Sequence, residues 1–268
     1  MVKVEYKYED HTWPEMKEEI KKGKVVVLMV GSIEQHGPAL PLGTDSFLGY
    51  EVCRRACEKI QDDALLLPPV YFGVSEHHVD FPGTIAISGE TLVRYVTEIC
   101  QSLVRHGFRK ILLVSGHGGN TQTLEAVVRE IALRTDALCM GLMYFSLITD
   151  ELKELRESEM GGIGHACEAE TSMMLHVRPE LVKKELVRRD GILKSDLLDS
   201  VPHDPNKRIV AFFIEPFSKW TKSGIIGDAT TANAVKGEKW VEAASNHLAE
   251  LIKQFKARPI PQRVDHHY

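Results

Sequence analysis

Residues 31–45, GSIEQHGPALPLGTD, carry three side chains of metal-ligand type, Glu34, His36 and Asp45. Glu34 and His36 are two positions apart, so in an extended chain they point the same way. The glycines and prolines before Asp45 allow the loop to fold back and bring the second carboxylate beside them. Two carboxylates and an imidazole suit Zn²⁺, Mn²⁺ or Fe²⁺. The alternative is an ordinary strand that ends in a polar loop.

A second polar stretch, GHGGN (116–120), also follows an apolar run directly. His117 is flanked by glycines and has no apolar packing to do, so we expect it to be a metal ligand or a catalytic group. The rival interpretation is a glycine-rich phosphate cradle, but the spacing matches neither G-x-G-x-x-G nor a P-loop.

A third stretch, HACEAETS (165–172), places His165, Glu168 and Glu170 close together. If the segment is helical, His165 and Glu168 share a face and Glu170 lies on another flank. A histidine here suits general acid–base chemistry, because its unperturbed pKa lies near neutrality. The alternative is a helix N-terminus with acidic residues in its first turn.

The loop GVSEHHVDFPGT (73–84) is rich in histidine, glycine and proline. We expect Ser75 and His78 to face the substrate, together with Gly118 of the GHGGN stretch. The alternative for the histidine pair of this loop is a solvated surface position.

The elements around these stretches indicate one α/β domain over residues 1–268. Apolar runs predict strands, amphipathic stretches between them predict helices, and such alternation predicts a mostly parallel sheet with helices on both faces. Ligands bind at the carboxyl ends of such strands, where the first two polar stretches fall. The predicted strands are 24–30, 64–72, 110–115, 137–145 and 209–217, and the predicted helices are 13–21, 46–60, 88–106, 121–134, 147–160 and 233–256. The stretch 160–177 starts glycine-rich and is predicted to become helical before Pro179.

Together the polar stretches supply three histidines and several carboxylates, enough for two metals that share a bridging carboxylate. Such a pair activates a hydroxide and polarises a carbonyl, so hydrolysis is the expected chemistry. The sequence has no G-x-S-x-G elbow that would favour a covalent serine mechanism. Two other hypotheses stay open: a non-catalytic or sugar-phosphate-binding α/β protein, and a mononuclear metal isomerase or lyase.

The bulk composition is that of a cytoplasmic protein. The net charge is −5 and no basic block stands out, which argues against nucleic acid or an anionic membrane as a partner. No apolar run is long enough for a membrane span. The five cysteines form no C-x-x-C pair, so we expect reduced thiols that pack in the core.

The four motifs GSIEQHGPALPLGTD, FPGT, GHGGN and HACEAETS, in this order, resemble those of the creatininase (creatinine amidohydrolase) family. The resemblance implies a three-layer α/β fold and two divalent metal ions per chain. It places Glu34, Asp45 and His117 on one metal and His36 with the bridging Asp45 on the other, and His165 matches the catalytic histidine.

One motif departs from creatininase itself, which has an aromatic residue and then a metal-binding glutamate after the histidine of this motif. Those positions are Gly118 and Gly119 here. We therefore expect Glu170 to complete the second metal site, with Glu168 behind it as a catalytic group or substitute ligand.

The resemblance also implies an amidohydrolase that cleaves a C–N bond of a cyclic amide or formamide, and a homo-oligomer, expected to be a hexamer. Family members with GHGGN resemble a formylaminopyrimidine-nucleotide deformylase and a peptidase of mycofactocin maturation. These are the alternatives for the substrate.

Overall fold

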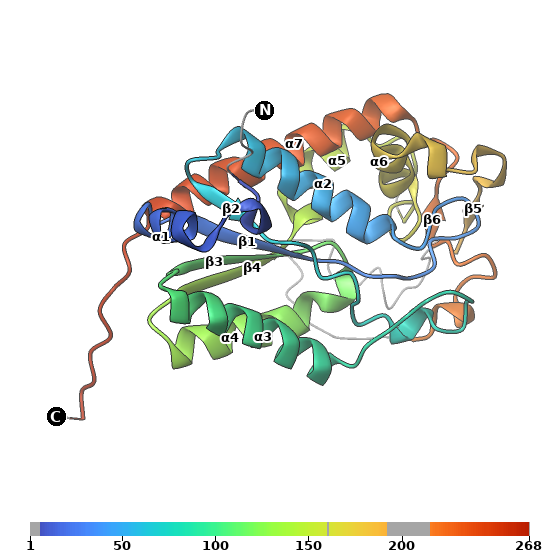
Figure 1. Cartoon of the computed structure of the whole chain (residues 1–268). Helices are drawn as coiled ribbons and strands as arrows, with labels where there is room; N and C mark the ends of the chain where they lie inside the picture. Colours follow the sequence, from blue (N-terminus) through green and yellow to red (C-terminus); the bar gives the residue numbers. More distant parts are fainter. Residues whose placement is uncertain (1–5, 160, 192–214, 268) are drawn as a thin grey trace.

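The centre of the protein is a four-stranded sheet in the order β2-β1-β3-β4, in which all neighbouring strands are parallel (Figure 1). We describe it from a computed structural model, which covers residues 6–159, 161–191 and 215–267. The strands are β1 (Val25–Val30), β2 (Ala64–Leu66), β3 (Lys110–Ser115) and β4 (Leu138–Met143). The predicted α/β fold with a parallel sheet is confirmed.

The continuous apolar sequence of β1 serves two separate hydrophobic cores. Every residue of the strand is buried, and successive side chains alternate between the faces of the sheet. Val25, Val27 and Met29 pack in the core that contains α2 (Thr44–Lys59) and α7 (Ala234–Ala257).

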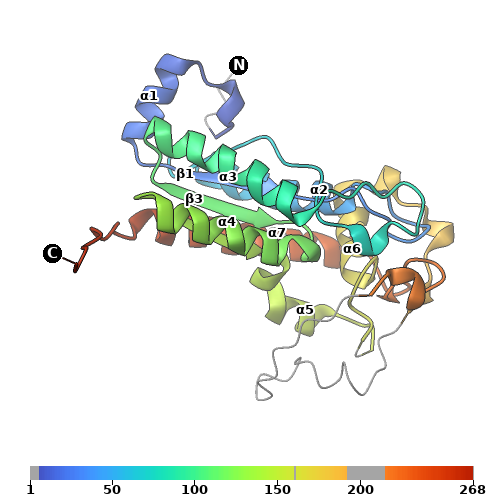
Figure 2. The same cartoon turned by 90° about the horizontal axis from the view of Figure 1, so that it is seen from below.

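The alternate β1 residues Val26, Leu28 and Val30 pack in the core that contains α3 (Gly89–His106) and α4 (Thr121–Arg134). Figures 1 and 2 show the resulting three layers, with α3 and α4 on one face of the sheet and α2 and α7 on the other. This is the predicted layer architecture.

The helix boundaries follow the local signals in the sequence. The hydroxyl of Ser88 accepts a hydrogen bond from the Thr91 N–H at 3.2 Å and caps α3, which ends at Gly107 in the left-handed region (φ 107°). The first helix, α1 (Trp13–Lys21), has the predicted bounds and a proline in its first turn.

Three predicted elements differ clearly in extent. The helix expected over 147–160 forms only over Thr149–Leu155, as α5. The strand expected over 64–72 pairs regularly only as β2, because Pro68 and Pro69 carry no N–H for a ladder. The helix expected within 160–177 begins only at Glu168, as α6 (Glu168–Val177).

The remaining elements are short. Helix α5 (Thr149–Leu155) follows β4, and β5 (Arg189–Asp190) pairs antiparallel with β6 (Gly227–Asp228). Of the strand predicted over 209–217, residues 209–214 lie outside the described residues, and Phe217 begins a 3₁₀ helix. The 3₁₀ helices are η1 (Tyr8–Asp10), η2 (Glu76–His78), η3 (Gly118–Asn120), η4 (Tyr144–Ile148), η5 (Pro179–Leu181), η6 (Lys184–Leu186) and η7 (Phe217–Lys219).

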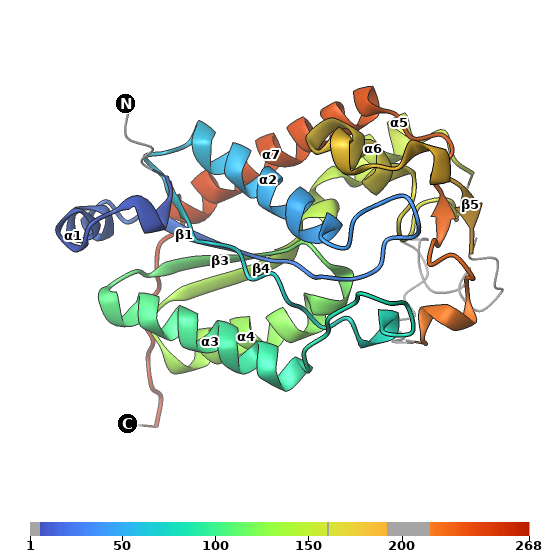
Figure 3. The same cartoon turned by 45° about the vertical axis from the view of Figure 1, so that its right-hand side comes forward.

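The carboxyl ends of the strands share one end of the molecule with α6 and the β5–β6 pair (Figure 3). The last residues of β1 and β3, Val30 and Ser115, are register partners, so the loops after these two strands start side by side. Among the described residues no helix is long and apolar enough to cross a membrane. All five cysteines are free thiols, and they lie in or against the two cores, as predicted.

Candidate metal centre

The loops after β1 and β3 place Glu34 and His117 against each other, and the first turn of α2 adds Asp45. His117 Nδ1 lies 3.1 Å from Glu34 Oε2 and 3.1 Å from Asp45 Oδ2. All three side chains are buried, and their ligand atoms form one compact donor set. Asp45 does not cap α2: Gly43 is the N-cap residue, and the Asp45 carboxylate faces His117 and His36 instead.

A second donor set shares the same aspartate. His36 Nε2 lies 3.1 Å from Asp45 Oδ1 and 3.6 Å from Glu170 Oε1. One oxygen of Asp45 therefore belongs to the set with His117 and the other to the set with His36. This is the arrangement of a carboxylate that bridges two cations.

Backbone carbonyls fix the tautomers of both ligand-type histidines. His117 Nε2 lies 3.0 Å from the Val74 carbonyl oxygen, and His36 Nδ1 lies 3.1 Å from that of Glu34. A carbonyl only accepts, so each of these nitrogens carries a proton. The other ring nitrogen, which faces the carboxylates, is the one that could bind a metal ion after giving up its own proton. Such carbonyl–histidine pairs are typical of the shell around bound metals.

The electrostatics of the cluster favour a cation at its centre. Burial disfavours the charged ring of His117, yet Glu34 and Asp45 outweigh it and raise the pKa of His117 to about 10. Burial and the charge of Asp45 oppose ionisation of Glu34, but His117 holds the pKa of Glu34 down to about 2. Within the described part of the chain, Glu34 Oε1 and Asp45 Oδ2 are buried without a hydrogen bond. The carboxylates thus stabilise positive charge between them, in the form of a proton on the ring of His117, and a divalent metal ion that replaced this proton would fit the same donor atoms.

The other carboxylate oxygen of Glu34 is fixed by two serine hydroxyl groups. Glu34 Oε2 accepts hydrogen bonds from Ser75 Oγ at 2.7 Å and from Ser32 Oγ at 2.8 Å. Ser75 is fully buried and is not part of the cavity wall. The structure therefore gives Ser75 a role in orienting Glu34 rather than the expected contact with substrate.

Asn120 of the GHGGN stretch joins the loops behind the site. Its side-chain oxygen accepts from the Val74 N–H at 2.9 Å, and its amide nitrogen donates to the Gly31 carbonyl at 2.9 Å. The bond to residue 74 steadies the same segment whose carbonyl orients His117. Sequence reasoning assigned no role to Asn120, although its place beside a candidate ligand is a usable signal.

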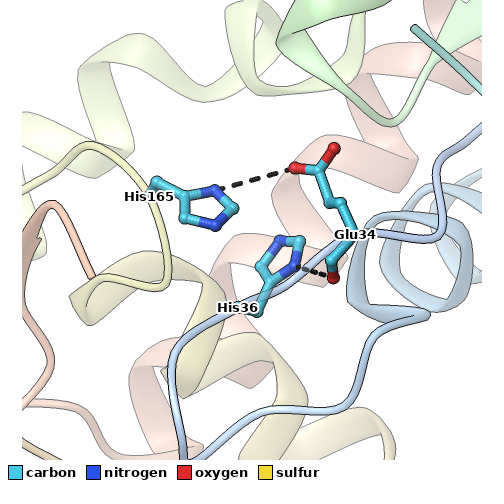
Figure 4. A group of neighbouring side chains, drawn as sticks. All are labelled: Glu34, His36 and His165. Carbon is cyan, nitrogen blue, oxygen red and sulfur yellow. Dashed lines mark hydrogen bonds and ion pairs between the residues drawn. The ribbon is translucent and has the colours of Figure 1, made fainter. Parts of the chain in front are cut away.

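His165 lies in an extended segment that pairs with Ile226. Its Nε2 lies 2.7 Å from the Gln35 carbonyl oxygen, and its Nδ1 lies 3.8 Å from Glu34 Oε1 (Figure 4). Burial and the neighbouring His36 lower the pKa of His165, so its neutral form is favoured.

Glu168 is not brought into this cluster. Its carboxylate accepts from the backbone N–H groups of Glu157 and Ser158, both at 2.9 Å, and is paired with Lys236. The helical spacing that grouped it with His165 does not apply, because α6 begins at Glu168 itself. The predicted catalytic or ligand role of Glu168 therefore has no support in its position.

Glu170 lies at the second donor set, where it was predicted, whereas position 119 cannot supply a carboxylate. A Cβ atom at Gly119 would lie 2.4 Å from His117 Nε2 and 2.5 Å from the Val74 carbonyl oxygen. The GHGGN backbone thus leaves no room for a carboxylate side chain at position 119. Glu170 arrives instead from α6, on the far side of the cluster.

A cavity of about 380 Å³ opens onto the cluster. His78 and Gly118 line it, as expected for substrate-facing residues. Several residues of its wall were not predicted. They are Met143 at the end of β4, Phe145 just after it, the residues beyond α6, and His77 on the histidine side. The residues beyond α6 are Glu215, Phe217, Trp220 and Ile226.

Phe217 packs on the histidines of this wall. Its ring centroid is 4.1 Å from that of His78 and 5.2 Å from that of His165. The cavity therefore has a polar floor of histidines and carboxylates and an aromatic wall, as small-molecule sites commonly do.

The parallel sheet, with an acid–histidine cluster at its strand ends, defines an α/β enzyme with a candidate metal centre. The family model of creatininase, described as creatinine amidohydrolase, matches residues 9–252. The chain belongs to the creatininase family and is a hydrolase of the amidohydrolase class.

Two curated relatives show the spread of activities among similar proteins. The mycofactocin precursor peptide peptidase of Mycolicibacterium smegmatis is 32% identical over 237 residues, which is 87% of this chain and 85% of the relative. The 3-dehydro-scyllo-inosose hydrolase of Thermotoga maritima is 26% identical over 268 residues, 94% of this chain and 84% of the relative.

The fold is also that of solved creatininase structures. The crystal structure of creatinine amidohydrolase superposes with a TM-score of 0.78 at 28% identity, covering 95% of this chain and 99% of that one. Other creatininase structures that match are described as a Zn–Zn type and as a manganese form.

Proposed function

We propose that the protein is a metal-dependent amidohydrolase that holds two divalent cations and cleaves a C–N amide bond of a small molecule. The observation that carries the proposal is the pair of donor sets that share Asp45. Glu34, Asp45 and His117 would hold one ion, and His36, Asp45 and Glu170 the other. Zinc, manganese and iron all suit this mixture of nitrogen and carboxylate donors.

The two bound ions would supply Lewis acidity that lowers the pKa of water and polarises a carbonyl group. Hydrolysis adds a hydroxyl group to the carbonyl carbon and a proton to the departing nitrogen. We assign that proton transfer to His165, because its Nδ1 faces the cluster and its lowered pKa favours the neutral ring: Nδ1 would take a proton from the water that adds to the carbonyl carbon and pass it to the nitrogen as the C–N bond breaks. An amide nitrogen leaves readily only when it is protonated, which makes this transfer essential.

The size and lining of the cavity limit the substrate. A volume of about 380 Å³ fits a small molecule or the end of a peptide, and the aromatic side chains favour a planar group such as a cyclic amide or formamide. The Thermotoga relative, named as a 3-dehydro-scyllo-inosose hydrolase, gives a second candidate class of substrate. A non-catalytic binding protein remains the contrasting hypothesis.

The proposal is tested by removing and restoring metal during a substrate screen. Protein dialysed against a chelator is reloaded with Zn²⁺, Mn²⁺ or Fe²⁺ and assayed on cyclic amides, N-formyl amines, short peptides and 3-dehydro-scyllo-inosose. We expect amide hydrolysis that disappears with metal and returns with it. Asp45→Asn should stay inactive at every metal concentration, whereas Asp228→Asn, which alters another buried carboxylate, should stay active. Hydrolysis that resists the chelator would contradict the proposal, and metal binding without turnover of any substrate would favour the binding protein.

We also propose a cytoplasmic homo-oligomer, expected to be a hexamer. The free cysteines support a cytoplasmic location. Association is supported by large apolar side chains that are exposed on the loops beside the site, among them Tyr71, Phe72, Val79 and Ile85.

A further inference from the structure

Gln35 stands between the two ligand-type residues of the first loop, and its buried side-chain amide has a fixed orientation. The Gly37 N–H donates to Oε1 at 2.9 Å, and Nε2 donates to the Gly224 carbonyl at 3.0 Å. These two backbone partners, one donor and one acceptor, determine which end of the amide is nitrogen. Gly224 allows the contact, since a Cβ there would lie 1.8 Å from Gln35 Oε1.

The second hydrogen of the Gln35 amide is directed at His78. Gln35 Nε2 lies 2.9 Å from His78 Nδ1, which must therefore accept and carry no proton. The proton of the neutral ring is then on Nε2. That nitrogen lies 3.2 Å from Glu34 Oε1, to which it donates in this tautomer, and both residues line the cavity.

The backbone of Gln35 has the opposite effect on His165. Its carbonyl oxygen lies 2.7 Å from His165 Nε2, so that nitrogen must carry the proton. The Gln35 side-chain nitrogen is also 3.1 Å from His165 Nε2 and could donate to it only if Nε2 carried no proton. An unprotonated Nε2 would then be repelled by the lone pairs of the Gln35 carbonyl oxygen, which is closer, at 2.7 Å. His165 therefore turns its unprotonated Nδ1 to the cluster.

We propose that Gln35 is a positioning residue that gives the two histidines beside Glu34 opposite polarity. Its side chain makes His78 a hydrogen-bond donor to the cavity, and its carbonyl makes His165 a proton acceptor there. The two rings are 4.5 Å apart between centroids, so a single substrate can contact both. The catalytic consequence rests on the proposed function, whereas the tautomers do not.

The tautomers are measured by NMR on zinc-loaded protein with ¹⁵N-labelled histidine, the signals being assigned with His78 and His165 variants. In the unmodified protein we expect a proton on Nε2 of both rings. The isosteric Gln35→Glu offers His78 an acceptor in place of the donor, so the His78 proton should move to Nδ1. His165 should not change, because the backbone carbonyl is retained. A proton on Nδ1 of His78 in the unmodified protein would overturn the proposal without any variant.

Kinetics then show whether Gln35 acts through His78. Gln35→Glu should lower kcat by about 10–100-fold at unchanged metal content, the usual effect of losing a partner that orients an active-site group. His78→Gln keeps an N–H near the Nε2 position and needs no tautomer control. In the His78→Gln background, Gln35→Glu should lower kcat by less than about threefold, because the effects of two residues that act through one another are not additive. An undiminished loss there would overturn the proposal. If no substrate is turned over, the NMR result still decides the tautomers.

Discussion

Glu170→Gln should empty the second metal site selectively. The side chain contributes to the donor set with His36 and Asp45 but not to the set with His117. At an effective dielectric constant of about 20, two unit charges about 4 Å apart interact by about 4 kcal/mol, and a divalent ion doubles this. The retained amide oxygen and the easier desolvation offset part of the loss. A net loss of about 4 kcal/mol corresponds to a roughly 10³-fold weaker affinity for the second ion.

The assay is a titration of metal-depleted protein with buffered Zn²⁺, read as bound zinc per chain. The unmodified protein should reach two ions, and Glu170→Gln should hold one ion with little change in its affinity. Glu215→Gln is the matched control, since Glu215 lines the same cavity and bonds instead to Lys219 and Trp220. Two ions bound at unchanged affinity in Glu170→Gln would refute the reasoning and remove Glu170 from the site.

Four further predictions follow from the same geometry. Gly119→Ala should destabilise the fold by about 1–3 kcal/mol and weaken metal binding, because its Cβ would press on His117. A Cβ atom at Gly118 would have no atom within 4 Å, so Gly118→Ala should leave the melting temperature and metal content unchanged. Equal effects of the two substitutions would contradict this geometry. His165→Ala should keep its full metal content and lower kcat by roughly 10²–10⁴-fold, whereas loss of metal would make His165 a ligand. Asp45→Ala should lose both ions by elemental analysis, and retention of both would end the idea of a bridge. Sedimentation should show an oligomer at micromolar concentration, and a monomer would contradict the proposed assembly.

The sheet and most helices could be predicted because their signals are local. The uninterrupted apolar run of β1 indicates burial on both faces, and Ser88 and Gly107 mark the ends of α3 through their own hydrogen bonds and dihedral angles. The donor residues were also accessible, because each follows a strand end or lies in a polar loop next to one. Even Glu170 followed from the missing carboxylate at Gly119.

The rest of the site depends on contacts between residues far apart in the chain. Phe217 ends the stretch 209–217 that was predicted as a strand, and Trp220 follows it; neither was predicted to line the cavity. Gln35 acquires its role only when Gly224, 189 positions away, comes within hydrogen-bonding distance. Glu168 was grouped with His165 by helical spacing, and the late start of α6 removes that spacing.

The shared aspartate is tested most directly by an anomalous diffraction map at the zinc edge from crystals grown with Zn²⁺. We predict two peaks per chain, about 3.5–4 Å apart, each bound by a different oxygen of Asp45. His36 and Glu170 should complete the coordination of one zinc ion, and Glu34 and His117 that of the other, with ligand distances of about 2.0–2.2 Å. A single peak, or two peaks that Asp45 does not join, would contradict the account.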